Sequence, residues 1–154
     1  MLETVWLIIA ALAFGGVVEK AGVLDRLMAP IIGWARSAGS LVASLVGAVI
    51  VTNVIASDQY IAIVLPGRMF KSTFQARGLA AVVLSRTIAA AGTPTSALVP
   101  WNSCGAYMAA TLGVATFSYL PYAAFNFASP LLAIALAYAG LRMPTEPLQR
   151  EPAA

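Results

Sequence analysis

The chain has 154 residues, of which 60% are hydrophobic and 10% are charged, and it contains no histidine. Soluble domains carry about 25% charged residues, so this composition indicates a membrane protein. The lack of histidine excludes Ser-His and Cys-His nucleophilic pairs, and the single cysteine, Cys104, excludes intrachain disulfides and thiolate zinc cages. We therefore expect no enzyme. Nine bases scattered between apolar runs form no continuous basic face, so we expect no nucleic-acid partner.

Three runs without any charge divide the sequence. They are 15, 21 and 55 residues long and cover residues 4–18, 37–57 and 87–141. Because a helix of about 20 apolar residues crosses a bilayer, these runs predict an all-α membrane protein with transmembrane helices. The first run predicts a span that stays in the protein, since no basic segment precedes it as in a signal peptide. Residues 19–36 mix charged and apolar positions, which is typical of an amphipathic segment at the membrane surface.

The second apolar stretch, residues 37–67, is too long for one simple span. As a single helix it would measure about 45 Å, so we expect a break or turn near Thr52-Asn53. The flanking segments 19–36 and 67–86 hold seven bases and two acids, as cytoplasmic loops do. Two loops on one side predict that residues 37–67 enter and return as a re-entrant helical hairpin with its tip near residues 52–58. A full crossing with a broken middle is the alternative.

The third run is also interrupted. The sequence TPTS, Thr93 to Ser96, predicts a break in a discontinuous helix that resumes from Ala97. Beyond a turn at residues 114–119, Pro121 fits the start of the last span, and Pro130 predicts a kink within it. The membrane part then covers residues 1–143, and the proline-rich polar residues 144–154 predict a disordered tail.

Asp58 is the only acid between Asp25 and Glu146, and it lies in an apolar stretch. An ionisable group inside a membrane is costly, so it is a candidate functional residue by default. A buried carboxyl group can alternate between carrying a proton and holding a cation, which is the minimal chemistry of coupled exchange. The alternative is a structural charge, either at the water interface or in an ion pair with Arg68 or Arg86.

Polar side chains gather beside both predicted breaks. Broken helices inside a membrane leave backbone oxygens free, and these oxygens suit hard cations such as Na+ when Ser, Thr and Asn side chains join them. We predict an ion- and proton-binding site formed by Asp58, Thr52, Asn53, Ser57, Thr93, Thr95, Ser96 and Asn102. Na+ itself is placed at Asp58, Asn53 and Thr95. Alternatively, each polar group only caps or kinks its own helix.

Four other side chains near these motifs have less specific interpretations. Trp101 either forms a wall of the site or packs in the ordinary way. Tyr60 and Tyr107 are predicted to be packing residues, and Cys104 is predicted to be a small apolar residue rather than a ligand.

Three segments resemble the C-terminal part of the NhaC family of sodium/proton antiporters. They are TNVIASDQYIAIVLPGRMF (residues 52–70), LSRTIAAAGTPTSALVPWNSCGAYMAATLGVATFSYLPYAAFN (residues 84–126) and the opening TVWLIIAALAFGGVVEKAGVLD. This resemblance covers nearly the whole chain apart from its tail, but only about a third of a family member.

The resemblance implies the ion transporter superfamily, whose members are built from inverted repeats, each with a re-entrant hairpin and a discontinuous helix. Thr52-Asn53 followed by Leu65-Pro66 resembles the motif of the hairpin tip, and Thr93-Pro94-Thr95 resembles the motif of the broken helix. The expected fold is therefore half of an inverted-repeat ion transporter.

The expected function is secondary active transport, in which Na+ is exchanged for protons across the inner membrane of a bacterium. The chain would be a fragment or a separately encoded part of the transporter. Ion gradients would supply the energy, so no cofactor is expected beside the transported Na+ and H+. The expected partners are the lipid bilayer and either the missing N-terminal repeat or another copy of the chain. Two alternatives are a proton- or sodium-coupled organic-anion exchanger, with Arg86 as the nearest base, and a non-transporting subunit or truncated gene product.

Overall fold

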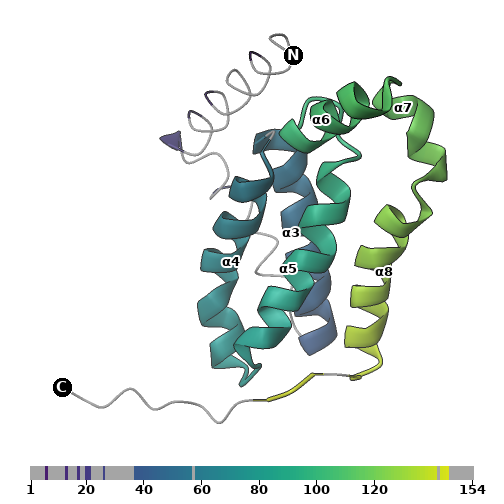
Figure 1. Cartoon of the computed structure of the whole chain (residues 1–154). Coiled ribbons are helices and arrows are strands. Elements are labelled where there is room, and N and C mark those ends of the chain that lie inside the picture. Colours follow the sequence, from purple (N-terminus) through teal and green to yellow (C-terminus); the bar gives the residue numbers. More distant parts are fainter. Residues whose placement is uncertain are drawn as a thin grey trace.

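The computed structural model describes residues 37–56, 58–141 and 143–145, with six single positions before them. This part is helical apart from one isolated β-bridge (Figure 1). The first span expected at residues 4–18, the surface segment at 19–36 and Ser57 lie outside the described residues.

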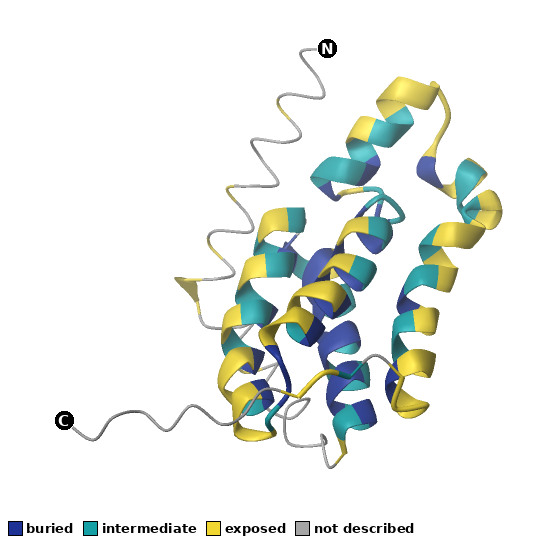
Figure 2. Cartoon of the chain, turned by 60° about the horizontal axis from the view of Figure 1, so that its bottom comes forward, coloured by how far each residue is buried: buried dark blue, intermediate teal, exposed yellow. Residues whose placement is uncertain are grey.

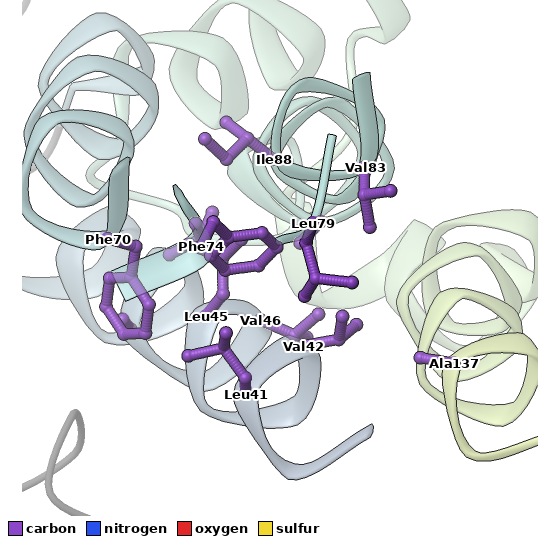
Figure 3. Packing of buried hydrophobic residues seen from close by; sticks show 13 residues of the cluster. Leu41, Val42, Leu45, Val46, Phe70, Phe74, Leu79, Val83, Ile88 and Ala137 are labelled. Carbon is purple, nitrogen blue, oxygen red and sulfur yellow. The ribbon is translucent and has the colours of Figure 1, made fainter. Parts of the chain in front are cut away.

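Helices α3 (Ala38–Ala56) and α4 (Gln59–Ala76) form an antiparallel hairpin (Figure 1). Leu41 and Leu45, at the beginning of α3, belong to the same buried cluster as Phe70 and Phe74, near the end of α4 (Figure 3). The chain therefore reverses direction between the two helices.

Helix α3 ends at Ala56 and α4 begins at Gln59, so the chain reverses at the far end of the predicted tip region 52–58, and α3 is not broken at Thr52-Asn53. Helix α3 continues through both residues, and the Thr52 hydroxyl donates a hydrogen bond to the Ala48 carbonyl, 2.8 Å away, within the same helix. Asp58 begins α4 as its N-cap, and its Oδ1 accepts hydrogen bonds from the backbone N–H of Tyr60 at 2.8 Å and of Ile61 at 3.2 Å.

Helix α5 (Ala81–Ser96) and helix α6 (Ser103–Leu112) are separated by residues 97–102. The break predicted inside TPTS is wrong in its position, since α5 runs through Pro94 to Ser96 and the helix resumes at Ser103 instead of Ala97. The connecting segment packs tightly on α6. A Cβ atom at Gly105 would lie 1.9 Å from the Val99 carbonyl oxygen, so this approach requires glycine.

After α6 the chain returns to the bundle through two short elements, α7 and η1, which lead to the longer helix α8. Helix α6 ends at Gly113, whose φ of 69° is in the left-handed region that glycine adopts readily. Helix α7 (Thr116–Tyr119) falls in the predicted turn, and Pro121 lies in the 3-10 helix η1 (Leu120–Tyr122) that precedes α8.

Helix α8 (Ala124–Tyr138) runs beside α3 and α5 and contains Pro130 (Figure 1). The approach of α3 to α8 is close, because a Cβ atom at Gly39 would lie 2.9 Å from the ring of Tyr138.

Buried side chains lie where α3, α4 and α5 face one another, whereas the outer faces of α4 and α8 are exposed (Figure 2). Tyr60 and Tyr107, which were predicted to be packing residues, are 78% and 60% exposed on the described part of the chain. Large apolar side chains on α8 are exposed as well, among them Phe125, Leu131 and Leu132. Such a surface fits a lipid or protein environment better than water.

Within the described ranges, α3 is the one helix that is both long and apolar enough to cross a bilayer by itself. Residues Thr116–Tyr122 together with α8 make a second candidate, which is bent by 57° at the break between them.

The first residues after α8 return to the loop between α4 and α5. Thr145 pairs with Leu79 in the isolated β-bridge, and the Ala80 N–H donates to the Pro144 carbonyl at 3.0 Å. The first two residues of the predicted tail are thus ordered, and the remainder lies outside the described residues.

Candidate ion-binding site at the two helix breaks

Asn53 joins the hairpin to the broken helix. Its side chain is fully buried near the end of α3, and Nδ2 donates to the Gly92 carbonyl and to the Thr95 hydroxyl oxygen, both at 2.9 Å. The Thr95 hydroxyl in turn donates to the Ala91 carbonyl at 2.6 Å. The two motifs, separated by 42 residues in the sequence, are therefore in direct contact, as their predicted common cavity requires.

Asn102 extends this contact to the second half of the broken helix. It is fully buried and caps α6, because its Oδ1 accepts a hydrogen bond from the Cys104 N–H at 3.1 Å. Its Nδ2 lies 3.2 Å from the Asn53 carbonyl oxygen and 3.4 Å from Asn53 Oδ1. A single amide thus holds the beginning of α6 against the end of α3.

Gln59, which sequence reasoning missed, connects the beginning of α4 to the end of α5 and to the beginning of α6. Its Oε1 lies 3.1 Å from Ser96 Oγ at the end of α5 and 2.8 Å from Cys104 Sγ at the beginning of α6. Ser96 Oγ also lies 2.8 Å from the Thr93 carbonyl, so its one proton has two possible acceptors. Cys104 is half-buried, and its thiol contacts this amide in addition to packing.

Asp58 is only 3% exposed, and its described hydrogen bonds go to the first turn of α4. The nearest member of the cluster is Gln59, the next residue in the chain. An ion pair with Arg68 does not fit, because ten residues of helix separate the two residues by about 15 Å. Arg86 lies equally far from Ser96, the residue of α5 that meets Gln59. The geometry favours a helix cap over an ion pair as the structural alternative for Asp58.

The remaining predicted residues take other positions. Thr52 is buried but bonds to its own helix, and Thr93 is exposed on a separate groove between α4 and α5. Ser57 lies outside the described residues. The structure therefore brings together Asn53, Thr95, Ser96 and Asn102, and it does not bring Thr52 or Thr93 to them.

Two polar side chains of α8, also missed from the sequence, contact the end of α5. Pro94 has no N–H, so the Ala90 carbonyl lacks its usual donor in the helix. Ser129 Oγ supplies a hydrogen bond to this oxygen at 2.8 Å, and Asn126 Nδ2 donates to the Pro94 carbonyl at 2.9 Å. Their spacing of three on an otherwise apolar helix was the available signal, since such residues share a face.

Trp101 anchors the segment between α5 and α6. It is half exposed, and its Nε1 donates to the Val54 carbonyl at 2.8 Å. This indole therefore binds the backbone at the end of α3, where helix carbonyls lose their partners.

A cleft of about 300 Å³ adjoins the cluster between α3, α5 and α8. Asn53, Thr95 and Asn126 are among the residues that line it, but the surface that they and their neighbours expose to the cleft is apolar. The oxygens of the cluster itself lie near the C-terminal end of α5, where helix carbonyls carry partial negative charge that suits an alkali cation.

Comparisons with known proteins show the family to which the chain belongs. Residues 1–141 match the family described as the Na+/H+ antiporter family. The Na+/H+ antiporter NhaC of Alkalihalophilus pseudofirmus is 39% identical over 141 residues, and that of Bacillus subtilis is 36% identical over 138 residues, covering 92% and 90% of this chain. A malate-2H+/Na+-lactate antiporter of Bacillus subtilis is 36% identical over 140 residues, or 91% of the chain.

The matched region is 30% of the length of each of these three relatives. The chain thus spans less than a third of the curated proteins that it resembles. No solved structure matches it.

Proposed function

Because the chain belongs to the Na+/H+ antiporter family, we propose that it supplies the C-terminal membrane part of a secondary transporter that exchanges Na+ for protons. Its match to two NhaC antiporters supports this activity. Since it spans 30% of their length, the exchange belongs to a complete transporter, of which this chain is one part. The expected location is the inner membrane of a bacterium.

In this proposal α3–α4 is a re-entrant hairpin, and α5–α6 is the discontinuous helix, of one half of an inverted-repeat transporter. The observation that carries the proposal is the contact of Asn53 with Thr95 and the Gly92 carbonyl. The Gly92 carbonyl oxygen and the Thr95 hydroxyl oxygen both accept hydrogen bonds from the Asn53 NH2 group, which carries partial positive charge. Rotation of the Asn53 amide would replace that partner with Oδ1 and leave three oxygens around a position suited to Na+.

Asp58 carries the proton in the proposed exchange. Its carboxyl group is buried beside Gln59, which contacts Ser96 of the broken helix. Release of a proton would leave a negative charge that attracts Na+ toward the cluster. Binding of the next proton would then favour the release of Na+. This competition couples the two ions without any nucleotide.

The decisive experiment is Asp58→Asn, measured as Na+-driven proton movement in everted vesicles that contain the complete transporter. Asparagine caps a helix as well as aspartate does, so α4 should form normally, and the variant loses only the titrating group. We expect insertion to be unchanged and exchange to be lost, while Asp58→Glu keeps partial activity. Exchange at the wild-type rate with the same pH dependence would show that Asp58 is only a helix cap.

A second candidate function is proton- or sodium-coupled exchange of an organic anion. The similarity to a malate-2H+/Na+-lactate antiporter is the observation in its favour. Arg86, the base considered for a carboxylate, lies about 15 Å along α5 from Ser96, so it is displaced from the polar cluster. Uptake of labelled malate or lactate by the same vesicles, driven by an imposed Na+ or proton gradient, would distinguish this function from simple cation exchange.

A further inference from the structure

A second groove, distinct from the candidate ion site, lies between α4 and α5. Its volume is about 400 Å³, and Asn53, Thr95, Ser96 and Asn102 do not line it. On α4 its walls include Ile63, Arg68 and Lys71, and on α5 they include Leu84, Ile88 and Ala89. The groove is therefore basic on one wall and largely apolar along the remainder.

Among the described residues, no acid compensates the positive charge on this groove. Arg68 and Lys71 are three residues apart on one helix, which places them on the same face, and both are exposed. Within the described residues neither side chain has an ion-pair partner. From residue 59 to residue 145 the sequence contains five bases and no acid. Asp58, the one acid within the described ranges, is about 15 Å from Arg68 along α4.

The apolar wall of the groove is formed largely by α5 and lies alongside these two bases. Between Ala81 and Thr93, two of its lining residues, α5 rises by about 18 Å. Ile88 and Gly67 meet within it, where a Cβ atom on the glycine would lie 3.1 Å from Ile88 Cδ1. A long apolar trough with a basic pair on one wall has the dimensions and charge of a site for one acyl chain with a negative headgroup.

We propose that this groove binds an anionic phospholipid, with its phosphate between Arg68 and Lys71 and one acyl chain against Leu84, Ile88 and Ala89. Basic pockets between membrane helices recognise lipid headgroups through the same combination of charge and apolar contact. A protein segment from elsewhere in the transporter would need its own negative charge to satisfy both bases. Such a lipid site requires that the protein lies in a bilayer, but it does not depend on Na+/H+ exchange.

The test measures retained lipid by native mass spectrometry on the chain purified with any other part of its transporter. Phosphatidylglycerol and phosphatidylcholine with identical acyl chains are the two probes, and inorganic phosphate is the competitor. We expect phosphatidylglycerol to bind preferentially. Replacing both bases, Arg68→Gln with Lys71→Gln, should weaken its binding about 30-fold, because each base contributes about fivefold.

Two further variants separate the groove from general charge. Lys20→Gln with Arg77→Gln removes the same charge outside the groove and should change binding less than about threefold, since charge effects fall off within a Debye length. Ala89→Phe keeps the charge but fills the space beside the exposed apolar wall, so it should prevent lipid binding. It tests the groove independently if the double variant does not fold. The proposal is wrong if the control pair weakens binding equally, if phosphatidylcholine binds as tightly, if inorganic phosphate displaces the lipid, or if the complete transporter retains no lipid here.

Discussion

Thr52 and Asn53 are adjacent and both buried, yet their side chains have different partners. The threonine hydroxyl donates to the Ala48 carbonyl in its own helix, while the asparagine amide reaches across to Gly92 and Thr95 on α5. At the residue scale, this difference assigns the contact between the two helix breaks to Asn53. It also gives a matched pair of neighbouring positions for mutagenesis.

We expect Asn53→Ala to raise the Na+ concentration needed for half-maximal exchange at least tenfold, because a proposed ligand is lost and buried partners lose a donor worth about 1–3 kcal/mol. Thr52→Val replaces a hydroxyl by a methyl group of similar size. Because this hydroxyl serves only its own helix, the substitution should change that Na+ concentration less than threefold. The measurement is the Na+ dependence of proton movement in vesicles. Equal effects of the two substitutions would contradict the assignment.

Ser129 provides a second test at the residue scale because it compensates for a proline. We expect Ser129→Ala to destabilise the bundle by about 1–3 kcal/mol, since the Ala90 carbonyl then has no donor. Pro94→Ala restores an N–H in α5 for the same carbonyl. The double variant should therefore recover much of the loss in thermal unfolding experiments in detergent. If the effects of the two single substitutions simply add in the double variant, Ser129 does not satisfy this oxygen.

The sequence predicts the order of the helices better than it predicts the residues at which they begin and end. Charge-free runs and basic segments predicted the α3–α4 hairpin, and two polar motifs predicted the meeting of Asn53 with Thr95. The predicted break at Thr93–Ser96 was wrong because α8 supplies hydrogen bonds that let α5 continue through Pro94. Partners provided by distant helices are not visible in a local pattern, and Gln59 was missed for the same reason.

The break between α5 and α6 depends on Gly105. We expect Gly105→Ala to displace this segment and destabilise the fold by about 1–3 kcal/mol, because its Cβ would collide with the Val99 carbonyl, a backbone atom that no rotamer change can move. Gly47→Ala is the matched control, since nothing lies within 4 Å of its Cβ position and alanine favours a helix.

Both variants can be followed by thermal unfolding and by the labelling rate of Cys104, the single cysteine, which lies next to Gly105. Faster labelling in Gly105→Ala, but not in Gly47→Ala, would indicate that the beginning of α6 has loosened. Unchanged stability and labelling in both would mean that the segment at residues 97–102 adapts without cost.

At the scale of the whole molecule, the beginning of α3 and the end of α4 lie at the same end of the bundle. Leu41, near the beginning of α3, packs in the same cluster as Phe74, near the end of α4, and Thr145 pairs with Leu79 in the following loop. The predicted basic segments 19–36 and 67–86 adjoin these ends. Bases are typical of the cytoplasmic side of a membrane, so this end of the bundle should face the cytoplasm.

Single cysteines placed at Ser37 and Gly78 in a Cys104→Ser background test this orientation. Both positions adjoin the outer ends of the hairpin, and neither lies within a helix. We expect a membrane-impermeant thiol reagent to label both from the cytoplasmic side, in everted vesicles, and neither in intact cells. A matched cysteine at Gly113, beyond the break and also outside a helix, controls for reagent access to the other end of the bundle. Labelling of Ser37→Cys and Gly78→Cys from opposite sides would be incompatible with the hairpin, because a chain that enters and returns must leave both ends on one face of the bilayer.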